Sequence, residues 1–278
     1  MAKMKIQISK DDFEQSILAA TSSHSEVFES VEKHFDESYL RLSRQILGEV
    51  GEEALETSDD LREAVIKAVC LDAFLGVVRH LDLVLTPTGF GVVANNEVTP
   101  ASSSRVEALI EQCRIALIVA QDTVMSHLTV VSGWGSTLQA QQGIQTVVWS
   151  MEGYCYLTRQ TSMTSKDWMS KLAAMQEADA TLRKLVSDEQ MDDIMCLVRG
   201  VREGNEFEGC VRLMLSRSLI MLANDMLSAY SNERARLLRY FDAHLDNFPI
   251  YADSSAYKAN HFKEFNNEKS KPAFVFNA

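Results

Sequence analysis

The stretch PASSSRVEALIEQCRIALIVAQDTVMSHLTVV, Pro100–Val131, carries the pattern of a long amphipathic helix. Its serines at 102 to 104 can cap the first turn, because a serine side chain at that position accepts a backbone N–H bond. Apolar residues then recur three or four positions apart, which places them on one helical face. That face consists of Val106, Leu109, Ile110, Cys113, Leu117 and Ala120. We therefore expect one long helix near the middle of the chain.

The same periodicity recurs through most of the sequence, and only four prolines interrupt it. Pro249 restrains the residue before it away from helical geometry and is expected to end the last long helix. Helices are predicted at about 25–47 with Gly48 as the cap, 58–80 with Ser58 or Asp59 as the cap, 144–157, 168–185, a short one opened by Ser187 with Gln190 three residues on, and 207–245. The predicted fold class is mainly all-α: a multi-helix bundle with a short β-hairpin between helices and an extended C-terminal arm.

The β-hairpin is predicted near residues 83–94. Two short β-prone runs, LDLVLT and FGVV, flank the turn sequence PTG. A ligand-cradling glycine loop is the alternative, but Gly89-x-Gly91 lacks the third glycine of a dinucleotide loop and the Gly-Lys-Ser/Thr of a phosphate loop. A hairpin that projects from a helical body has strand edges that need protection or a partner. Its candidate partner-binding residues are Thr86, Pro87, Gly89, Phe90 and Gly91.

The final segment, 250–278, lacks a helical period and yet is rich in aromatic residues. A solvated tail is normally poor in such residues, so the rings are expected to pack on the protein's own body or on a partner. The alternating FVF beside Pro272 suits an extended strand added to a sheet edge. The candidate partner-binding residues of this arm are Tyr257, His261, Phe262, Phe265, Pro272, Phe274 and Phe276.

The segment SGWGSTLQAQQG, residues 132–143, is the predicted linker between two helical halves. It combines glycines, serines and glutamines between two periodic regions. The expected division is an N-terminal helical half at 1–131, a C-terminal helical half at 144–249 and the arm at 250–278.

Composition limits the classes of function. The net charge is −12, which argues against non-specific binding of nucleic acid over the whole surface, although an acidic wall would let DNA slide past. The apolar runs are short and interrupted by charge, so no membrane span is predicted, and no signal peptide precedes the first acidic residues. The five cysteines are scattered in apolar helical contexts, where a reduced thiol acts as a small hydrophobic group.

The sequence predicts no catalytic, cofactor-binding or metal-binding residues. Di-metal helical bundles carry Glu-x-x-His pairs, whereas zinc sites carry Cys-x-x-Cys or His-Glu-x-x-His. None of these three patterns occurs in the sequence. Residues 133–137, GWGST, do not match the Gly-x-Ser-x-Gly of a nucleophile elbow. An enzyme would need a converging polar pocket, which this sequence does not predict. The expected class is therefore non-enzymatic.

Two long phrases resemble a family of uncharacterised proteins encoded by phages and prophages of gut Bacteroidetes, near virion structural genes. They are HLDLVLTPTGFGVVANNEVTPASSSRVEAL, 80–109, and NFPIYADSSAYKANHFKEFNNEKSKPAFVFNA, 247–278. The resemblance implies a virion component, and the helical body with a hairpin and an arm is similar to head–tail connector (adaptor) proteins. The usual adaptor body has about half this length, so the second helical half is an addition whose role the resemblance leaves open.

The resemblance implies a homo-oligomeric ring, twelve-fold by analogy, that docks beneath the portal protein and contacts other neck or tail proteins while DNA passes without specific binding. It places the protein at the neck of the virion after synthesis in the host cytoplasm, away from any membrane. The alternatives are a tail-assembly chaperone or another non-enzymatic phage protein-binding module, and an enzyme with an unrecognised site.

Overall fold

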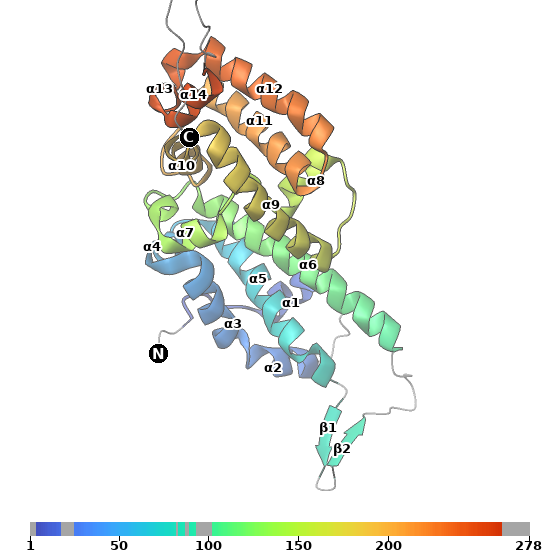
Figure 1. Cartoon of the computed structure of the whole chain (residues 1–278). Helices are drawn as coiled ribbons and strands as arrows, with labels where there is room; N and C mark the ends of the chain where they lie inside the picture. Colours follow the sequence, from blue (N-terminus) through green and yellow to red (C-terminus); the bar gives the residue numbers. More distant parts are fainter. Residues whose placement is uncertain (1–3, 18–24, 82, 87–88, 93–101, 263–278) are drawn as a thin grey trace, which may run out of the picture.

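The computed structural model describes residues 4–17, 25–81, 83–86, 89–92 and 102–262. Figure 1 shows two groups of helices with the long helix α6, Ser103–Leu128, running between them. We call the helices that precede α6 the N-terminal lobe and those from α8 onward the C-terminal lobe. The body is mainly helical, as the periodicity predicted.

The N-terminal lobe consists of short helices arranged around one long helix. Its elements are α1 Lys10–Ser16, α2 Ser25–Glu32, α3 Phe35–Leu42, a π-helical turn Ser43–Leu47, α4 Gly48–Ala54, α5 Asp59–Val77 and a 3-10 turn Val78–His80. Helix α5 packs against α1, α2, α3 and α6, and apolar side chains are buried around most of its circumference. A helix that is apolar on all sides is typical of a lobe centre. Ser58 caps α5 as predicted, because its side chain accepts the N–H of Leu61.

The helix predicted over 25–47 is interrupted. It is divided into α2 and α3 by a turn at Lys33 and His34, and its last turn widens into the π-helical segment. The interruption lets Phe28 and Phe35 both contact the ring of Phe13, at centroid distances of 5.8 and 6.4 Å. Packing of these rings supplies a tertiary stabilisation that periodicity along one helix does not reveal.

Two four-residue strands follow α5. The strands β1, Leu83–Thr86, and β2, Gly89–Val92, pair antiparallel, with Leu83 opposite Val92 and Thr86 opposite Gly89. They form a two-stranded sheet, so among the described residues each strand has one paired edge. Figure 1 shows this pair beyond the ends of α5 and α6, away from both lobes.

The segment 132–143 is a packed part of the body and not the predicted linker. It forms a 3-10 turn, Trp134–Ser136, and α7, Leu138–Gly143, which packs on the π-helical turn. The Trp134 ring is fully buried, and its Nε1–H donates to the carbonyl of Ile46 at 2.9 Å. Gly133 adopts a left-handed φ of +89° at the turn before Trp134, and the glutamines lie within α7, so this composition reflects a packed turn and helix.

The C-terminal lobe contains the remaining helices. They are α8 Met151–Thr158, α9 Ser165–Val186, α10 Asp188–Val198, α11 Glu206–Ala223, α12 Leu227–Ala243, a 3-10 turn Leu245–Asn247, α13 Pro249–Asp253 and α14 Ser255–Asn260. Helix α8 starts later than predicted, since residues 144–150 are irregular and yet bury Ile144, Val147 and Val148. Ser187 caps α10 as predicted by accepting the N–H of Gln190.

The single helix predicted over 207–245 is in fact a helical hairpin of α11 and α12. The chain turns at Asp225, whose φ of +54° lies in the left-handed region. Asn224 holds this turn: its side-chain Nδ2 donates to the Ile220 carbonyl at 2.7 Å, and its Oδ1 accepts from Lys171 Nζ at 2.7 Å. The break therefore depends on a lysine of another helix, which lies outside the local sequence pattern.

The prediction of an extended arm over 250–278 is wrong for residues 250–260. Residues 249–260 form α13 and α14, and the Tyr251 ring is fully buried against Phe241 at a centroid distance of 4.4 Å. The Asn260 side chain donates to the Leu185 carbonyl at 3.0 Å and to the Tyr251 hydroxyl at 3.2 Å. The receiving surface for these aromatic residues is the protein's own body. Residues 263–278 lie outside the described residues.

The two lobes share one hydrophobic core. A continuous cluster of buried apolar side chains extends from Phe13 in the N-terminal lobe through Val124 and Leu128 of α6 to Phe241 in the C-terminal lobe. Within the described ranges, no helix is long and apolar enough to cross a membrane.

Candidate ligand-binding cleft

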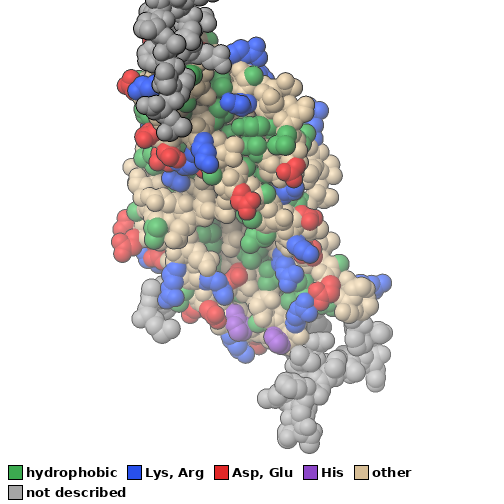
Figure 2. Space-filling model, viewed as in Figure 1, with side chains coloured by type: hydrophobic (Ala, Val, Ile, Leu, Met, Phe, Trp, Pro, Cys, Tyr) green, Lys and Arg blue, Asp and Glu red, His purple; other side chains and the backbone are tan. Residues whose placement is uncertain are grey.

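A cleft of about 630 Å³ opens where α6 meets α9, the π-helical turn and the segment after α7. We call it the central cleft. Its lining residues are Gln45, Ile46, Arg114, Leu117, Ile118, Gln121, Asp122, Met125, Gln142, Gly143, Gln145, Thr146, Trp149, Ser165, Lys166, Trp168, Met169, Leu172 and Gln176. Figure 2 shows hydrophobic side chains gathered along the middle of the face seen in Figure 1. The cleft volume is within the range of small-molecule sites.

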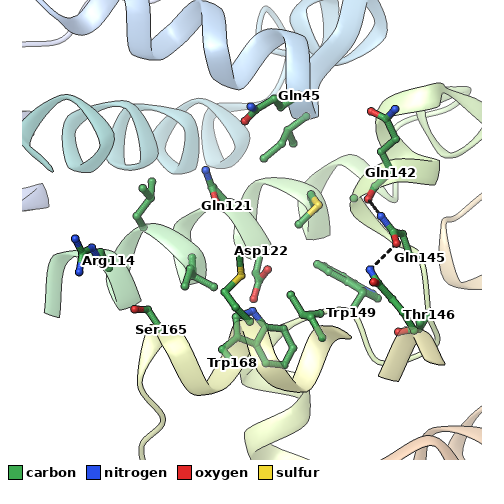
Figure 3. A pocket seen from close by; sticks show the side chains of 18 of the residues that line it. Gln45, Arg114, Gln121, Asp122, Gln142, Gln145, Thr146, Trp149, Ser165 and Trp168 are labelled. Atoms are coloured by element: carbon green, nitrogen blue, oxygen red, sulfur yellow. Dashed lines mark hydrogen bonds between the residues drawn. The ribbon is translucent and has the colours of Figure 1, made fainter. Parts of the chain in front are cut away.

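The walls of the central cleft are mainly apolar and aromatic. Trp168 belongs to the first turn of α9 and is 2% exposed, and the Tyr154 ring meets its edge at a centroid distance of 5.9 Å. Trp149 lies on the other side, in the irregular segment before α8 (Figure 3). Because Trp168 is almost fully buried and packs against Tyr154, the wall that it forms does not need a ligand in order to be ordered.

Asp122 lies at the base of the central cleft. Its side chain is only 7% exposed, and Figure 3 shows it pointing from α6 toward the space between Trp149 and Trp168. Its Oδ2 accepts the backbone N–H of Met151 at 2.8 Å, which ties α6 to the first turn of α8. Burial is the main reason that the pKa of Asp122 is raised to about 7, since desolvation disfavours the charged form, and the nearby charge of Glu152 adds to the effect.

No cation of the described part of the chain forms an ion pair with Asp122. The cations that line the cleft are Arg114 and Lys166, and both side chains are exposed. Arg114 lies eight residues before Asp122 on α6, about 12 Å along the helix at the usual rise. It pairs instead with Glu111, at 3.8 Å. The buried carboxyl group therefore has a hydrogen-bond donor but lacks a counter-charge.

Amide side chains form the rim of the cleft on the side of α7. Gln176 Nε2 donates to Gln145 Oε1 at 2.6 Å, and Gln145 Nε2 donates to the Gln142 carbonyl at 2.7 Å (Figure 3). At the opposite end Glu111 accepts from both the backbone N–H and the hydroxyl of Ser165, at 2.7 and 2.9 Å. These bonds fix the two ends of the cleft without filling its middle.

The sequence did not identify this site. Asp122 lies on an otherwise apolar part of α6, four residues after Ile118 and three before Met125, so its polarity within the buried face was the available signal. Its partners come from residues 149–176, which no local pattern connects to α6. The pocket of polar and aromatic groups that the sequence did not predict is therefore present.

The predicted hairpin residues are only partly described. Thr86 ends β1 and is paired with Gly89 of β2, and Phe90 and Gly91 pair with Leu85 and Val84. Pro87 lies outside the described residues. None of these residues lines the central cleft.

The predicted arm residues fall into two groups. Tyr257 and His261 are held by the chain itself: the Tyr257 ring meets that of Tyr251 at 5.5 Å, and His261 Nε2 lies 3.0 Å from Asp242 Oδ1. The hydrogen bond to the Tyr257 carbonyl is the main reason that the pKa of His261 is raised, and the Asp242 carboxylate adds to the effect. Phe262 is 79% exposed. Phe265, Pro272, Phe274 and Phe276 lie outside the described residues.

In the described ranges, no three or more His, Cys, Asp or Glu side chains lie close enough together to hold a metal ion. None of the five cysteines forms a disulfide, and burial raises the pKa of the Cys70 thiol to about 12. An un-ionised thiol is a poor nucleophile and metal ligand. Cys70 therefore acts as core packing.

A comparison with known proteins gives one partial match. The sequence profile of a family of unknown function, DUF6712, matches residues 32–137. The match covers most of the N-terminal lobe, the hairpin and α6, and it ends before the C-terminal lobe. No curated protein and no solved structure is significantly similar to the chain.

Proposed function

We propose that this protein is a non-enzymatic structural subunit of the neck of a tailed phage, an adaptor that oligomerises beneath the portal. The observation that carries the proposal is the hairpin of β1 and β2, which lies beyond the ends of α5 and α6 and away from both lobes (Figure 1). An exposed strand edge is a ready template for pairing with another chain. A projecting hairpin on a helical body is the feature that the resemblance to connector proteins also requires.

The way in which the hairpin is joined to α5 and α6 supports a role in contact with other chains. Arg79, just before β1, pairs with Glu107 of α6 at 2.9 Å, so the end of α5 is joined to the helix that follows the hairpin. The first turn of α6 is largely exposed, and Val106 in it is only partly buried. These residues form a surface next to the hairpin on which a neighbouring subunit can pack.

The composition of purified particles tests this function. A connector subunit should be present in the particle in a small fixed copy number relative to the portal protein, as measured by quantitative mass spectrometry. A tail-assembly chaperone, the second possibility, should be abundant in the infected cell and absent from the particle. Absence from purified particles would rule out the connector.

Two variants test the assigned surfaces. The first replaces Leu83–Val92 with a flexible Gly/Ser segment, and the second removes 263–278. The cut lies after Phe262, because Asn260 donates hydrogen bonds to Leu185 and Tyr251 and its removal would disturb α14. The matched control is Val130→Ser, which changes an 85% exposed apolar side chain outside both segments.

Both variants should retain the helical circular dichroism of the full chain and fail to join particles, whereas Val130→Ser should assemble normally. Normal assembly of the variant without the hairpin would contradict the proposal. Normal assembly of the shortened chain would show that residues 263–278 are not needed for assembly, and the proposal would then rest on the hairpin alone.

A further inference from the structure

We infer that the central cleft is a binding site for an organic cation, a primary ammonium or guanidinium group carried on an apolar stem, with Asp122 as its anchor. No described residue of the hairpin lines the central cleft, so the inference does not depend on the neck function. Three features of the described residues lead to it: a buried carboxyl group without a counter-charge, aromatic walls, and an open volume of drug-like size.

The carboxyl group supplies the anchor. Its Oδ2 is held by Met151 N–H at 2.8 Å, which fixes the orientation of the group. The side chain faces the cleft between Trp149 and Trp168 (Figure 3), where a donor from a ligand can reach the acceptor sites that Met151 leaves open. A hydrogen bond between charged groups is stronger than a neutral one, particularly where water is excluded.

The walls favour a cation with an apolar body. Trp149 is partly exposed in the cleft, and a tryptophan face attracts ammonium and guanidinium groups more strongly than the other aromatic rings do. Trp168, only 2% exposed, contributes a packed apolar wall. Leu117, Ile118 and Leu172 extend the apolar surface beyond the two indole rings. A stem of a few methylene groups or one aromatic ring would be buried against them, while an inorganic cation would leave this surface uncovered.

The charges around the site are compatible with a bound cation. Arg114 is exposed and paired with Glu111, and it lies about one Debye length from Asp122 along α6. Solvent therefore screens the repulsion between Arg114 and a cation bound at Asp122. Lys166, next to Ser165 in sequence, also lines the cleft and is exposed. Glu152, on α8, adds negative potential and raises the pKa of Asp122. A bound cation would supply the counter-charge that no described residue provides and would favour the ionised carboxylate.

The first experiment compares ligands of one shape and different charge on the full chain. The probes are 2-phenylethylamine, 2-phenylethanol and 3-phenylpropionate, followed by Trp fluorescence and by isothermal titration at about pH 8, roughly one unit above the pKa of Asp122. The amine should bind saturably, and at least about tenfold more tightly than the alcohol or the acid. Equal affinity for the amine and the alcohol, or no saturable amine binding up to about 10 mM, would overturn the inference.

The second experiment changes the anchor. Asp122→Asn keeps an oxygen to accept the Met151 N–H and removes the charge, so amine affinity should fall by about tenfold or more. Glu152→Gln is the matched control, because it also removes one negative charge near the start of α8. Glu152 is exposed and does not line the cleft. Its amine affinity should remain within about threefold of the unchanged protein. An equal loss in both variants would show that general electrostatics and not the anchor binds the amine.

A competition experiment separates the two sources of such a cation. A synthetic peptide with the sequence of residues 263–278, which contains Lys263, Lys269 and Lys271, is added to the amine complex. Displacement that is lost when the three lysines are replaced by norleucine would identify a lysine side chain of this chain as the natural ligand. Retention of the amine would identify a free small molecule.

Discussion

Asp122 shows how one side chain acquires its properties from segments far along the chain. On an isolated α6 it would be a solvated carboxylate with an ordinary pKa. In the folded protein α8 and α9 bury it, and the Met151 N–H is the single described donor that offsets the loss of water. The result is a carboxyl group whose pKa is raised to about 7.

The raised pKa predicts a specific dependence of stability on pH. The native state binds the Asp122 proton more tightly than the unfolded state, whose pKa is near the ordinary 3.8, so this group lowers the free energy of unfolding as pH rises from about 4 to 7. Asp122→Asn lacks this titration. The variant should equal the unchanged protein below about pH 4 and exceed it by about 2 to 4 kcal/mol above pH 7. Urea denaturation across this pH range measures the difference.

The difference between the two proteins isolates Asp122, because every other titrating group is common to both. Glu152→Gln serves as the control, and its difference from the unchanged protein should be small over the same range because Glu152 is exposed. A stability difference for Asp122→Asn that is independent of pH would show that the carboxyl group is not desolvated as the structure indicates.

Sequence reasoning was reliable at single residues where the interaction is local. The sequence predicted Ser58 or Asp59 and Ser187 as helix caps, and Ser58 and Ser187 each accept the backbone N–H of the residue three positions on. Gln190 illustrates the limit: its spacing suggested a reciprocal cap on Ser187, but its Oε1 accepts from Tyr251 N–H, 61 residues away. The same limit explains why Asp122 was not identified as a site.

At the level of elements, the sequence predicted helices with a strong period and missed the points where they break. Helices α5 and α6 lie close to their predicted bounds. The breaks after α2 and between α11 and α12 are stabilised by ring packing around Phe13 and by Lys171 binding to Asn224. These contacts come from other helices, so a one-dimensional pattern contains no signal for them.

Two helix starts make a matched test of local capping. Asn205 opens α11 with a complete capping box, accepting the Glu208 N–H while the Glu208 side chain accepts the Asn205 N–H. Ser102 opens α6 without a side-chain cap bond. Asn205→Ala should lower the free energy of unfolding by about 1 kcal/mol, and Ser102→Ala by less than about 0.5 kcal/mol. Thermal or urea denaturation of both variants gives the comparison, and equal losses would contradict the assigned cap.

At the scale of the whole molecule, the predicted division into two halves does not describe the packing. Helix α6 buries Val124 and Leu128 in a core that continues into both lobes, and Trp134 joins the supposed linker to Ile46 in the N-terminal lobe. The glycines and glutamines of 132–143 could be read from the sequence, but the buried environment of Trp134 could not. One shared core implies that the lobes depend on each other for stability.

The shared core predicts a single cooperative unfolding transition, and the three tryptophans provide the means to test it. In a variant with Trp149→Phe and Trp168→Phe, the fluorescence of Trp134 reports on the contact with the N-terminal lobe. In a Trp134→Phe variant, the remaining indoles report on α9 and the cleft. Within each variant, the urea transition of the fluorescence should coincide with that of the helical circular dichroism. Independent lobes would instead give separated midpoints within one variant, because Trp134 would follow only the N-terminal lobe while circular dichroism followed both.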